Sequence, residues 1–291
     1  MRRTLPSLLA AAALAGSLTL VVAPSALGAE TSRLAGPATC SGSISPGHYT
    51  SLVVKGVCFG PAKGLVSVSG RVTVAAGAAL LGNYPSPKKG APEGDATWRI
   101  GGGVTVASGG TFIMGCEAAF GCQLTTSDAI DGGITARDAL SVIVHATAIQ
   151  GRVFVSGGGG GEKCVPTGVF KMIGQPPYTD FEDNTVKGNL RVSDLASCWL
   201  GIARDAVDGN VTIAKDQLAD PDAIEILSNA IVGSLRCTAN SRVWDSAEAS
   251  FGQTSLYPRI AEPNSVVGDR LGQCVLASPA TEGGQPGPGP F

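Results

Sequence analysis

Acidic and basic side chains that could support acid–base chemistry gather in one part of this 291-residue chain. Inverting hydrolysis of a glycosidic bond needs two carboxyl groups about 6.5 to 9.5 Å apart, and β-elimination needs a basic residue beside a uronate that a metal ion or an Arg neutralises. Five residues are the candidate catalytic residues. They are Asp183, Asp205, Asp208, Arg191 and Arg204, among further acids at Asp180, Glu182, Asp220, Asp222 and Glu225 and further bases at Lys187 and Arg236. We favour the simpler interpretation that these charges keep an outward surface solvated.

Familiar motifs of catalytic and metal sites do not surround these residues. The glycine run 157–161 continues as Glu, Lys and Cys rather than Lys-Ser or Lys-Thr, which indicates a flexible turn and not a phosphate loop. No Gly-x-Ser-x-Gly elbow and no Cys-x-x-Cys pair occurs, and His48 and His145 have no ligand-like spacing. His145 lies in the alternating run 141–149, which predicts an outward strand position. We therefore predict no metal ion and no cofactor.

The composition excludes several classes of protein. The chain has 21 Lys and Arg against 23 Asp and Glu, with a net charge of -2, so it carries no overall positive field for nucleic acid. With 44% hydrophobic and only 15% charged residues it is a folded protein rather than a disordered one. The 41 glycines favour tightly turning β-structure over helices.

The N-terminal segment has the pattern of a secretory signal peptide. Arg2 and Arg3 precede an apolar run of about 15 residues, and small residues follow near Ala29. The run is shorter than the roughly 20 residues that span a bilayer, so we expect no stable membrane insertion after cleavage. We predict a signal peptide at 1–29, a folded domain at 30–276 and a disordered Pro/Gly-rich tail at 277–291. The protein is expected to be secreted, extracellular or associated with the cell wall.

Eight cysteines in an exported chain predict four disulfide bonds. Eight cysteines allow 105 pairings. In a chain that stacks locally, sequential neighbours are the simplest partners. The expected pairs are Cys40 with Cys58, Cys116 with Cys122, Cys164 with Cys198, and Cys237 with Cys274.

A short repeat runs through the chain, in which a glycine is followed by alternating apolar residues. Alternation of β-branched residues predicts a strand with one inward face, and the glycine marks a corner. The clearest glycines stand at 132, 151, 188, 209, 233 and 268, with further copies at 70 and 102 and a frayed copy at 56. Intervals of 19, 21 and 24 residues match one coil of a solenoid, and intervals of 37 and 35 fit either two coils or one coil with an insertion.

A second column of short polar residues precedes the glycines by four positions. It contains Asp128, Asn184, Asp205, Asn229 and Asn264. Such a column can form a hydrogen-bonded ladder at one corner of a stack, or it can present a row of ligand-binding groups. We favour the structural ladder.

These features resemble a right-handed parallel β-helix of the pectate-lyase-like architecture. The last 90 residues, with Gly-Asn rungs, the segment 198–201 and the closing Gly272 to Cys274, resemble uncharacterised exported bacterial β-helix proteins. The resemblance covers about residues 40 to 275, and it brings no catalytic motif. The expected fold is all-β, a single right-handed parallel β-helix solenoid with loop insertions and disulfide staples.

The segments that interrupt the repeat are expected to emerge as insertions and to carry the binding surface. They are 83–97, 116–122, 157–182 and 238–262. We expect a structural or binding protein that associates with extracellular or cell-envelope glycans, with Trp98, Trp199, Trp244, Tyr178 and Tyr257 as available stacking surfaces. Two alternatives stay open: a polysaccharide lyase or glycoside hydrolase acting on acidic polysaccharide, and a surface adhesion module that binds another protein.

Overall fold

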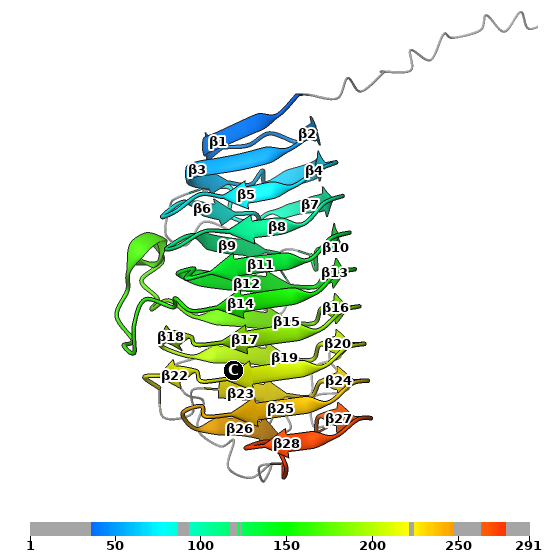
Figure 1. Cartoon of the computed structure of the whole chain (residues 1–291). Helices are drawn as coiled ribbons and strands as arrows, with labels where there is room; N and C mark the ends of the chain where they lie inside the picture. Colours follow the sequence, from blue (N-terminus) through cyan, green and yellow to red (C-terminus); the bar gives the residue numbers. More distant parts are fainter. Residues whose placement is uncertain are drawn as a thin grey trace, which may run out of the picture. The chain divides into compact units, whose positions relative to one another are not determined.

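Short parallel strands form nearly all the regular structure, as the alternating pattern predicted (Figure 1). The structure is a computed structural model that describes residues 36–86, 93–116, 122, 124–220, 224–246 and 263–277. The chain divides into Met1–Thr31 and Ser32–Phe291, and every described residue belongs to the second unit. The predicted signal peptide and the predicted tail from residue 278 onward lie outside the described residues.

The strands stack into three parallel ladders, and one rung of the solenoid takes one strand from each ladder in turn. The first ladder contains β2 (Gly47–Tyr49), β4 (Lys63–Val68), β7 (Asp95–Ile100), β10 (Asp128–Ile130), β13 (Thr147–Ile149), β16 (Thr185–Val186), β20 (Ala206–Val207), β24 (Ala230–Ile231) and β27 (Ser265–Val266). The second contains β1 (Ala38–Ser43), β3 (Leu52–Phe59), β5 (Val72–Val74), β8 (Val104–Val106), β11 (Ile134–Arg137), β14 (Val153–Ser156), β17 (Leu190–Ser193), β21 (Val211–Ala214), β25 (Leu235–Thr238) and β28 (Arg270–Gly272). The third contains β6 (Ala79–Leu81), β9 (Thr111–Met114), β12 (Ser141–His145), β15 (Thr179–Glu182), β19 (Leu200–Ala203), β23 (Ile224–Leu227) and β26 (Val243–Ser246).

The second and third ladders form one 17-stranded sheet because the long strand β3 pairs with both β5 and β6. Two short strands, β18 (Ala196–Ser197) and β22 (Gln217–Leu218), pair beside them. The only other described element of regular structure is the 3₁₀ helix η2 (Gly168–Met172). All pairings recorded between described strands are parallel, which is the arrangement of a parallel β-helix solenoid.

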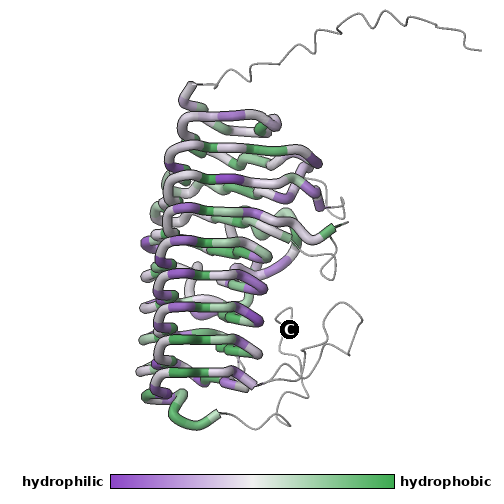
Figure 2. Tube along the Cα trace, turned by 90° about the vertical axis from the view of Figure 1, so that its right-hand side faces the viewer, coloured by the Kyte–Doolittle hydropathy of each residue, from purple (hydrophilic) through white to green (hydrophobic). Residues whose placement is uncertain are grey.

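Aliphatic columns fill the interior. In the second ladder the first inward position is occupied by an apolar residue that is at most 2% exposed in seven successive rungs, namely Val72, Val104, Ile134, Val153, Leu190, Val211 and Leu235. Full burial of one such side chain contributes roughly 1.5 to 3 kcal/mol. Figure 2 shows the rungs stacked one above another, with hydrophobic stretches that recur in successive rungs. Burial of this continuous column therefore drives the rungs to stack.

The predicted glycines stack at one corner between the first and second ladders. A Cβ at Gly209 would lie 2.5 Å from the carbonyl oxygen of Gly188, and a Cβ at Gly233 would lie 2.4 Å from that of Gly209. No side chain fits at that distance, so the column requires glycine. Because β14 pairs with β17 and β25 pairs with β28, each long interval contains one coil and an insertion.

The prediction for Gly56 is wrong. This residue lies inside β3, and the first corner of the glycine column is instead occupied by Thr50, whose carbonyl oxygen faces Gly70. At each later glycine of the column, the position that a Cβ would occupy lies against the backbone of the corner in the rung before it. Thr50 belongs to the first corner of the column, and the register of β1 with β3 aligns it with Gly36 at the start of the described residues.

The polar column forms the predicted hydrogen-bonded ladder, which we call the corner ladder. A side-chain oxygen in one rung accepts the backbone N–H of the equivalent residue in the rung before. The N···O distances are 2.7 Å from Trp98 to Asp128, 3.0 Å from Thr147 to Asn184, and 2.8 Å for Asn184 to Asp205, Asp205 to Asn229, and Asn229 to Asn264. The predicted members are at most 5% exposed, so the column holds rungs together and does not present a row of groups to a ligand.

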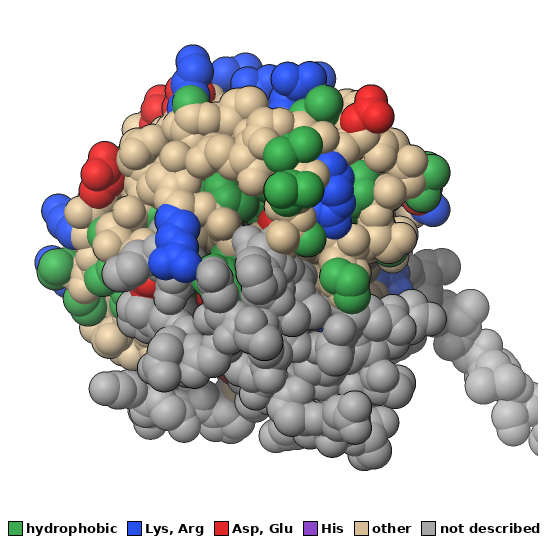
Figure 3. All heavy atoms as spheres, turned by 90° about the horizontal axis from the view of Figure 1, so that it is seen from below, with side chains coloured by type: hydrophobic (Ala, Val, Ile, Leu, Met, Phe, Trp, Pro, Cys, Tyr) green, Lys and Arg blue, Asp and Glu red, His purple; other side chains and the backbone are tan. Residues whose placement is uncertain are grey.

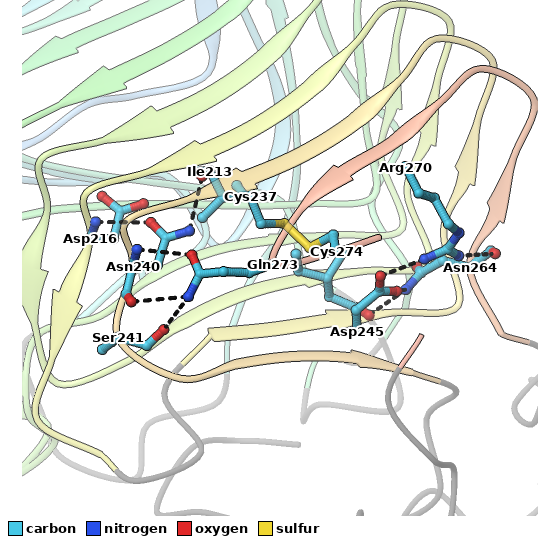
Figure 4. The surroundings of a disulfide bond; sticks show 11 residues. Ile213, Asp216, Cys237, Asn240, Ser241, Asp245, Asn264, Arg270, Gln273 and Cys274 are labelled. Atoms are coloured by element: carbon cyan, nitrogen blue, oxygen red, sulfur yellow. Dashed lines mark hydrogen bonds and ion pairs between the residues drawn. A yellow bond between two sulfur atoms is a disulfide. The ribbon is translucent and has the colours of Figure 1, made fainter. Parts of the chain in front are cut away.

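A second polar column lies at the corner between the second and third ladders, near the last rung. Asp216 Oδ1 accepts the N–H of Leu195 at 2.7 Å. Asn240 accepts that of Asp216 at 3.0 Å, and Gln273 accepts that of Asn240 at 2.9 Å (Figure 4). The Cys237–Cys274 disulfide lies beside this column (Figure 4). The bond therefore fastens the closing segment to β25.

All four disulfides join the cysteines as predicted. Cys40 bonds to Cys58, Cys116 to Cys122, Cys164 to Cys198 and Cys237 to Cys274. The first joins β1 to β3, and the third fastens the segment 157–178 to the turn before β19. Three of the four bonds therefore lie at the two ends of the described solenoid and at its largest described insertion, and Cys116–Cys122 lies between β9 and β10.

Three predicted insertions are shorter than expected because they contain rung strands. Strand β7 begins at Asp95 inside the segment 83–97, β15 begins at Thr179 inside 157–182, and β26 (Val243–Ser246) lies inside 238–262. Only Cys116 and Cys122 of the segment 116–122 are described. The remaining insertion at 157–178 contains η2 and projects from the stack of strands (Figure 1). Its Phe170 packs against outward residues of the third ladder such as Ile143.

Candidate functional site

Two of the five predicted catalytic candidates meet on the third ladder. The Nε–H of Arg204 donates to Asp183 Oδ2 at 2.7 Å, and an Nη of the same guanidinium lies 2.8 Å from Glu182 Oε2. Glu182 pairs in register with Ala203, so Asp183 and Arg204 occupy the same corner in successive rungs. Both have a left-handed backbone, with φ of 54° and 57°. The corner geometry thus places a carboxylate and a guanidinium side by side.

The other three candidates lie elsewhere. Asp205 is buried in the corner ladder. Asp208 lies at an exposed corner, where Lys187 Nζ is 2.9 Å from its Oδ2. Arg191 projects from β17 on the outer surface of the second ladder. The structure therefore does not gather the five candidates into one groove.

His145 and Asp180 join Glu182, Asp183 and Arg204 in what we call the acid cluster. In the pairing of β12 with β15, His145 lies opposite Glu182, and Asp180 lies opposite Ile143. Because side chains alternate along a strand, Asp180 and Glu182 both point outward while Phe181 between them enters the core. His145 Nε2 is 2.9 Å from Asp180 Oδ2, and one ligand atom from each of His145, Asp180 and Glu182 lies within 4.8 Å of the other two.

Burial governs the electrostatics of the acid cluster. Asp180 is 0% exposed and Glu182 is 1% exposed. Desolvation raises the pKa of Asp180 to about 7, opposed by its hydrogen bond with Glu182 and by the Arg204 charge. Desolvation also raises the pKa of Glu182 well above its ordinary value, and the neighbouring Asp180 charge adds to the rise. Burial therefore works against the ionisation of both carboxyl groups at once.

Aromatic and acidic neighbours enclose the acid cluster. Tyr178 stacks on Trp199 with ring centroids 4.1 Å apart, and burial raises its pKa well above the ordinary tyrosine value. Burial also raises the pKa of Glu93, while a hydrogen bond from Tyr84 and the charge of His145 oppose the rise. Asp180 and Glu182 are consequently shielded from solvent, whereas His145 and Asp183 stay partly exposed.

The spacing of the acids limits their chemistry. The Asp180 and Glu182 oxygens lie within 4.8 Å, whereas an inverting hydrolase needs about 6.5 to 9.5 Å between carboxyl groups to admit a water molecule. This pair therefore does not provide the inverting geometry.

Sequence reasoning did not combine His145 with the two acids. The insertion at 157–178 separates them along the chain, and only strand pairing brings them together. A signal was present in the alternation of residues 179–182, which predicts that Asp180 and Glu182 share one face.

A second candidate surface covers the outer side of the second ladder, and we call it the basic face. The charged side chains at its outward strand positions are Lys55, Arg137, Arg191 and Arg236, all exposed, and no described outward position of these strands carries a carboxylate. Lys and Arg side chains line the upper edge of Figure 3, which is the side of the solenoid that faces the viewer in Figure 1. Acids such as Asp138 and Asp194 lie at the adjoining corner.

Hydroxyl groups fill much of the basic face between the charges. Thr73, Thr105 and Thr135 occupy one column in three successive rungs, and Arg191, Thr212 and Arg236 continue this column after Phe154. Within the part of the chain that the structure describes, no carboxylate forms an ion pair with Arg191 or Arg236. The face therefore offers unneutralised guanidinium groups on a rigid sheet.

The aromatic residues do not form the expected stacking surface. Trp98, Trp199 and Trp244 are at most 5% exposed, and Tyr178 lies between Phe170 and Trp199. Tyr257 lies outside the described residues. The described tryptophans are thus core residues rather than platforms for sugar rings.

Comparisons with family models, curated proteins and solved structures found no match to this chain. The four disulfides are typical of proteins that fold outside the reducing cytosol. Among the described residues, no helix has the length and apolar character required to cross a bilayer.

Proposed function

We propose that the protein is exported and binds acidic extracellular or cell-envelope glycans along the basic face. The single observation that carries this proposal is the uniform sign of the exposed charges on that face, from Lys55 to Arg236, without a carboxylate at a described outward strand position. A net charge of -2 for the whole chain makes this local excess a property of one surface and not of the composition.

The spacing of the basic face suits a linear polyanion. Rungs repeat about every 4.8 Å, so Arg191 and Arg236, which are two rungs apart, lie about 10 Å apart along the solenoid axis. Thr212 lies between them and supplies a hydroxyl that can donate to or accept from a sugar. A glycan chain parallel to the axis would therefore meet guanidinium and hydroxyl groups in turn, on a backbone already fixed by the sheet.

Export is supported by the signal-peptide pattern at 1–29 and by the disulfides. The resemblance to the pectate-lyase-like β-helix architecture supports an acidic polysaccharide as the ligand class, because parallel β-helices often bind or cleave such polymers.

A polysaccharide lyase or hydrolase is the second candidate function. One observation favours it: the pKa values of Asp180 and Glu182 are raised beside Arg204, as in a site prepared for proton transfer. The burial of both acids weighs against it, since a sugar must contact its catalytic acid directly.

One panel of polymers tests both candidates. Purified full-length protein is run in native gels that contain a polyuronate, a sulfated polysaccharide or a neutral glucan. We expect retardation by the acidic polymers alone, and retardation should weaken as salt rises because exposed charges are screened. Equal retardation by the neutral glucan, or no retardation by any acidic polymer, would contradict the binding proposal.

The same mixtures are followed for absorbance of unsaturated sugars and for new reducing ends. Retardation without products supports a binding module. Steady release of either product, lost in Asp180→Asn, would replace binding with catalysis as the principal function.

A further inference from the structure

We infer that His145, Asp180 and Glu182 form a binding site for one divalent transition-metal ion of the Zn²⁺ type. This inference goes beyond glycan binding and does not depend on it, because the three residues lie on the third ladder and the basic face lies on the second.

The sheet itself places the three ligands. His145 ends β12 and lies opposite Glu182 of β15, while Asp180 is two residues earlier on the same outward face. One nitrogen of His145 and one oxygen of each acid all lie within 4.8 Å of one another. Ligands bound to one Zn²⁺ at about 2.0 to 2.2 Å are necessarily separated by less than this, so small side-chain rotations suffice.

Two buried oxygens support the site independently of that spacing. Asp180 Oδ1 and Glu182 Oε1 accept no hydrogen bond from a donor in the described chain. The other oxygen of each carboxyl group does have a partner, since Asp180 Oδ2 contacts His145 and Glu182 Oε2 contacts Arg204. A buried acceptor oxygen without a donor is costly, and a cation among the three residues would satisfy both.

The charges around the site favour a cation. Asp180, Glu182 and Asp183 supply three carboxyl groups, and Arg204 supplies one permanent positive charge. With the acids ionised, two negative charges remain uncompensated in a nearly buried group, and one divalent ion cancels them. Arg204 would then hold Glu182 in orientation from outside the coordination sphere, which is a common role of a second layer of contacts.

The ligand types select the class of ion. An imidazole nitrogen with two carboxylates suits Zn²⁺, Fe²⁺ or Co²⁺, whereas Ca²⁺ prefers six to eight oxygens. The His145 side chain is 14% exposed and that of Asp183 is 22% exposed, so an ion can enter from solvent on this side. The other described group of similar composition, Glu93 with Cys116 and Cys122, has its two sulfurs joined in a disulfide and offers no thiolate.

The test uses untagged full-length protein, stripped with a chelator and shown to contain no free thiol. Isothermal titration with Zn²⁺ should give one equivalent per chain, and Zn²⁺ should bind at least about tenfold more tightly than Ca²⁺ or Mg²⁺. Co²⁺ should give visible absorption bands that Zn²⁺ displaces. Absence of saturable Zn²⁺ binding to the folded, stripped protein would overturn the inference, and so would tighter binding of Ca²⁺.

Matched variants locate the ion. His145→Gln and Asp180→Asn should each weaken Zn²⁺ binding at least about tenfold. His48→Gln removes the chain's other histidine and should leave binding unchanged. Each variant is first checked for a cooperative melt, and Glu182→Gln replaces any that fails to fold. Equal Zn²⁺ affinity in the wild type and in the folded ligand variants would overturn the site.

Discussion

Asp205 Oδ1 accepts the backbone N–H of Asn184 at 2.8 Å, so a side chain of one rung holds the backbone of the rung before it. The Asp205 carboxyl is buried, and desolvation raises its pKa well above the ordinary value, although the Asn184 hydrogen bond opposes the rise. Its Oδ2 meets no donor among the residues the structure describes. At equivalent positions, Asn184 and Asn229 use Nδ2 to donate to strand carbonyls at 2.7 and 2.8 Å. Asp205 therefore occupies a place that suits an amide.

Asp205→Asn is expected to raise the free energy of unfolding by about 1 to 2 kcal/mol at pH 8. The new amide keeps the bond to Asn184 and gains a donor toward the carbonyl of Phe181, which the pairing aligns with Ile202. Urea unfolding at pH 8 measures the change. Asp208→Asn, at an exposed corner, should change stability by no more than about 0.5 kcal/mol. Destabilisation by Asp205→Asn would show that the ionised carboxylate is the form that the ladder needs.

Asp216 makes stability depend on pH at the second polar column. Burial raises its pKa to about 7, opposed by the hydrogen bond from Leu195. Since an unfolded Asp titrates near 4, the folded protein binds the proton more tightly. Its contribution to stability is therefore complete below pH 4 and is lost as the pH rises toward 7. Asp128, with a pKa raised to about 7 by burial, acts in the same direction.

Unfolding free energies measured from pH 4 to 8 should thus fall less steeply in Asp216→Asn than in the wild type. Asp131→Asn, an exposed control, should follow the wild-type curve. Parallel curves for all three proteins would refute the assignment of this pH dependence to Asp216.

Gly209→Ala should destabilise the solenoid by about 2 to 4 kcal/mol or prevent folding, because the new Cβ would meet backbone at 2.5 Å. Gly36→Ala adds a Cβ that meets nothing within 4 Å and serves as the control. Thermal melts followed by circular dichroism compare the two. Equal melting temperatures would mean that the glycine corners are looser than described.

Removal of the third disulfide should loosen the insertion at 157–178. The bond closes a sequence separation of 34 residues, which corresponds to about 3 to 4 kcal/mol in the chain-entropy model. The double variant Cys164→Ala/Cys198→Ala should therefore lose more stability than Cys116→Ala/Cys122→Ala, whose separation is 6 residues. Urea unfolding of the two variants gives the comparison, and the reverse order would contradict the entropic explanation.

The sequence predicted the solenoid well because its main signals are local and repeat in register. A glycine such as Gly132 or Gly209 packs against the corner before it, so each rung needs the same residue at the same place. Thr50, at the first corner of the column, is the exception to this rule. The polar column was predictable for the same reason, since Asn184 and Asn229 each hold the rung before them.

The acid cluster could not be predicted from spacing. His145 and Glu182 are neighbours only through the pairing of β12 with β15, and the insertion between these strands has no fixed length. The basic face could not be predicted from spacing either, because it also depends on how the rungs align. Alternation predicts that Arg191 and Arg236 point outward, but the alignment of their rungs is needed to place them in one column.

Affinity for an acidic polysaccharide is the most direct test of glycan binding by the basic face. Dissociation constants are measured at low salt for the wild type, for Arg191→Ser/Arg236→Ser, and for Lys187→Ser, which removes an exposed charge at a corner outside the face. The account predicts that the double variant binds about tenfold or more weakly, as loss of two charge-assisted contacts requires, and that Lys187→Ser binds like the wild type. Equal affinity of the wild type and the double variant, or an equal loss in Lys187→Ser, would contradict it.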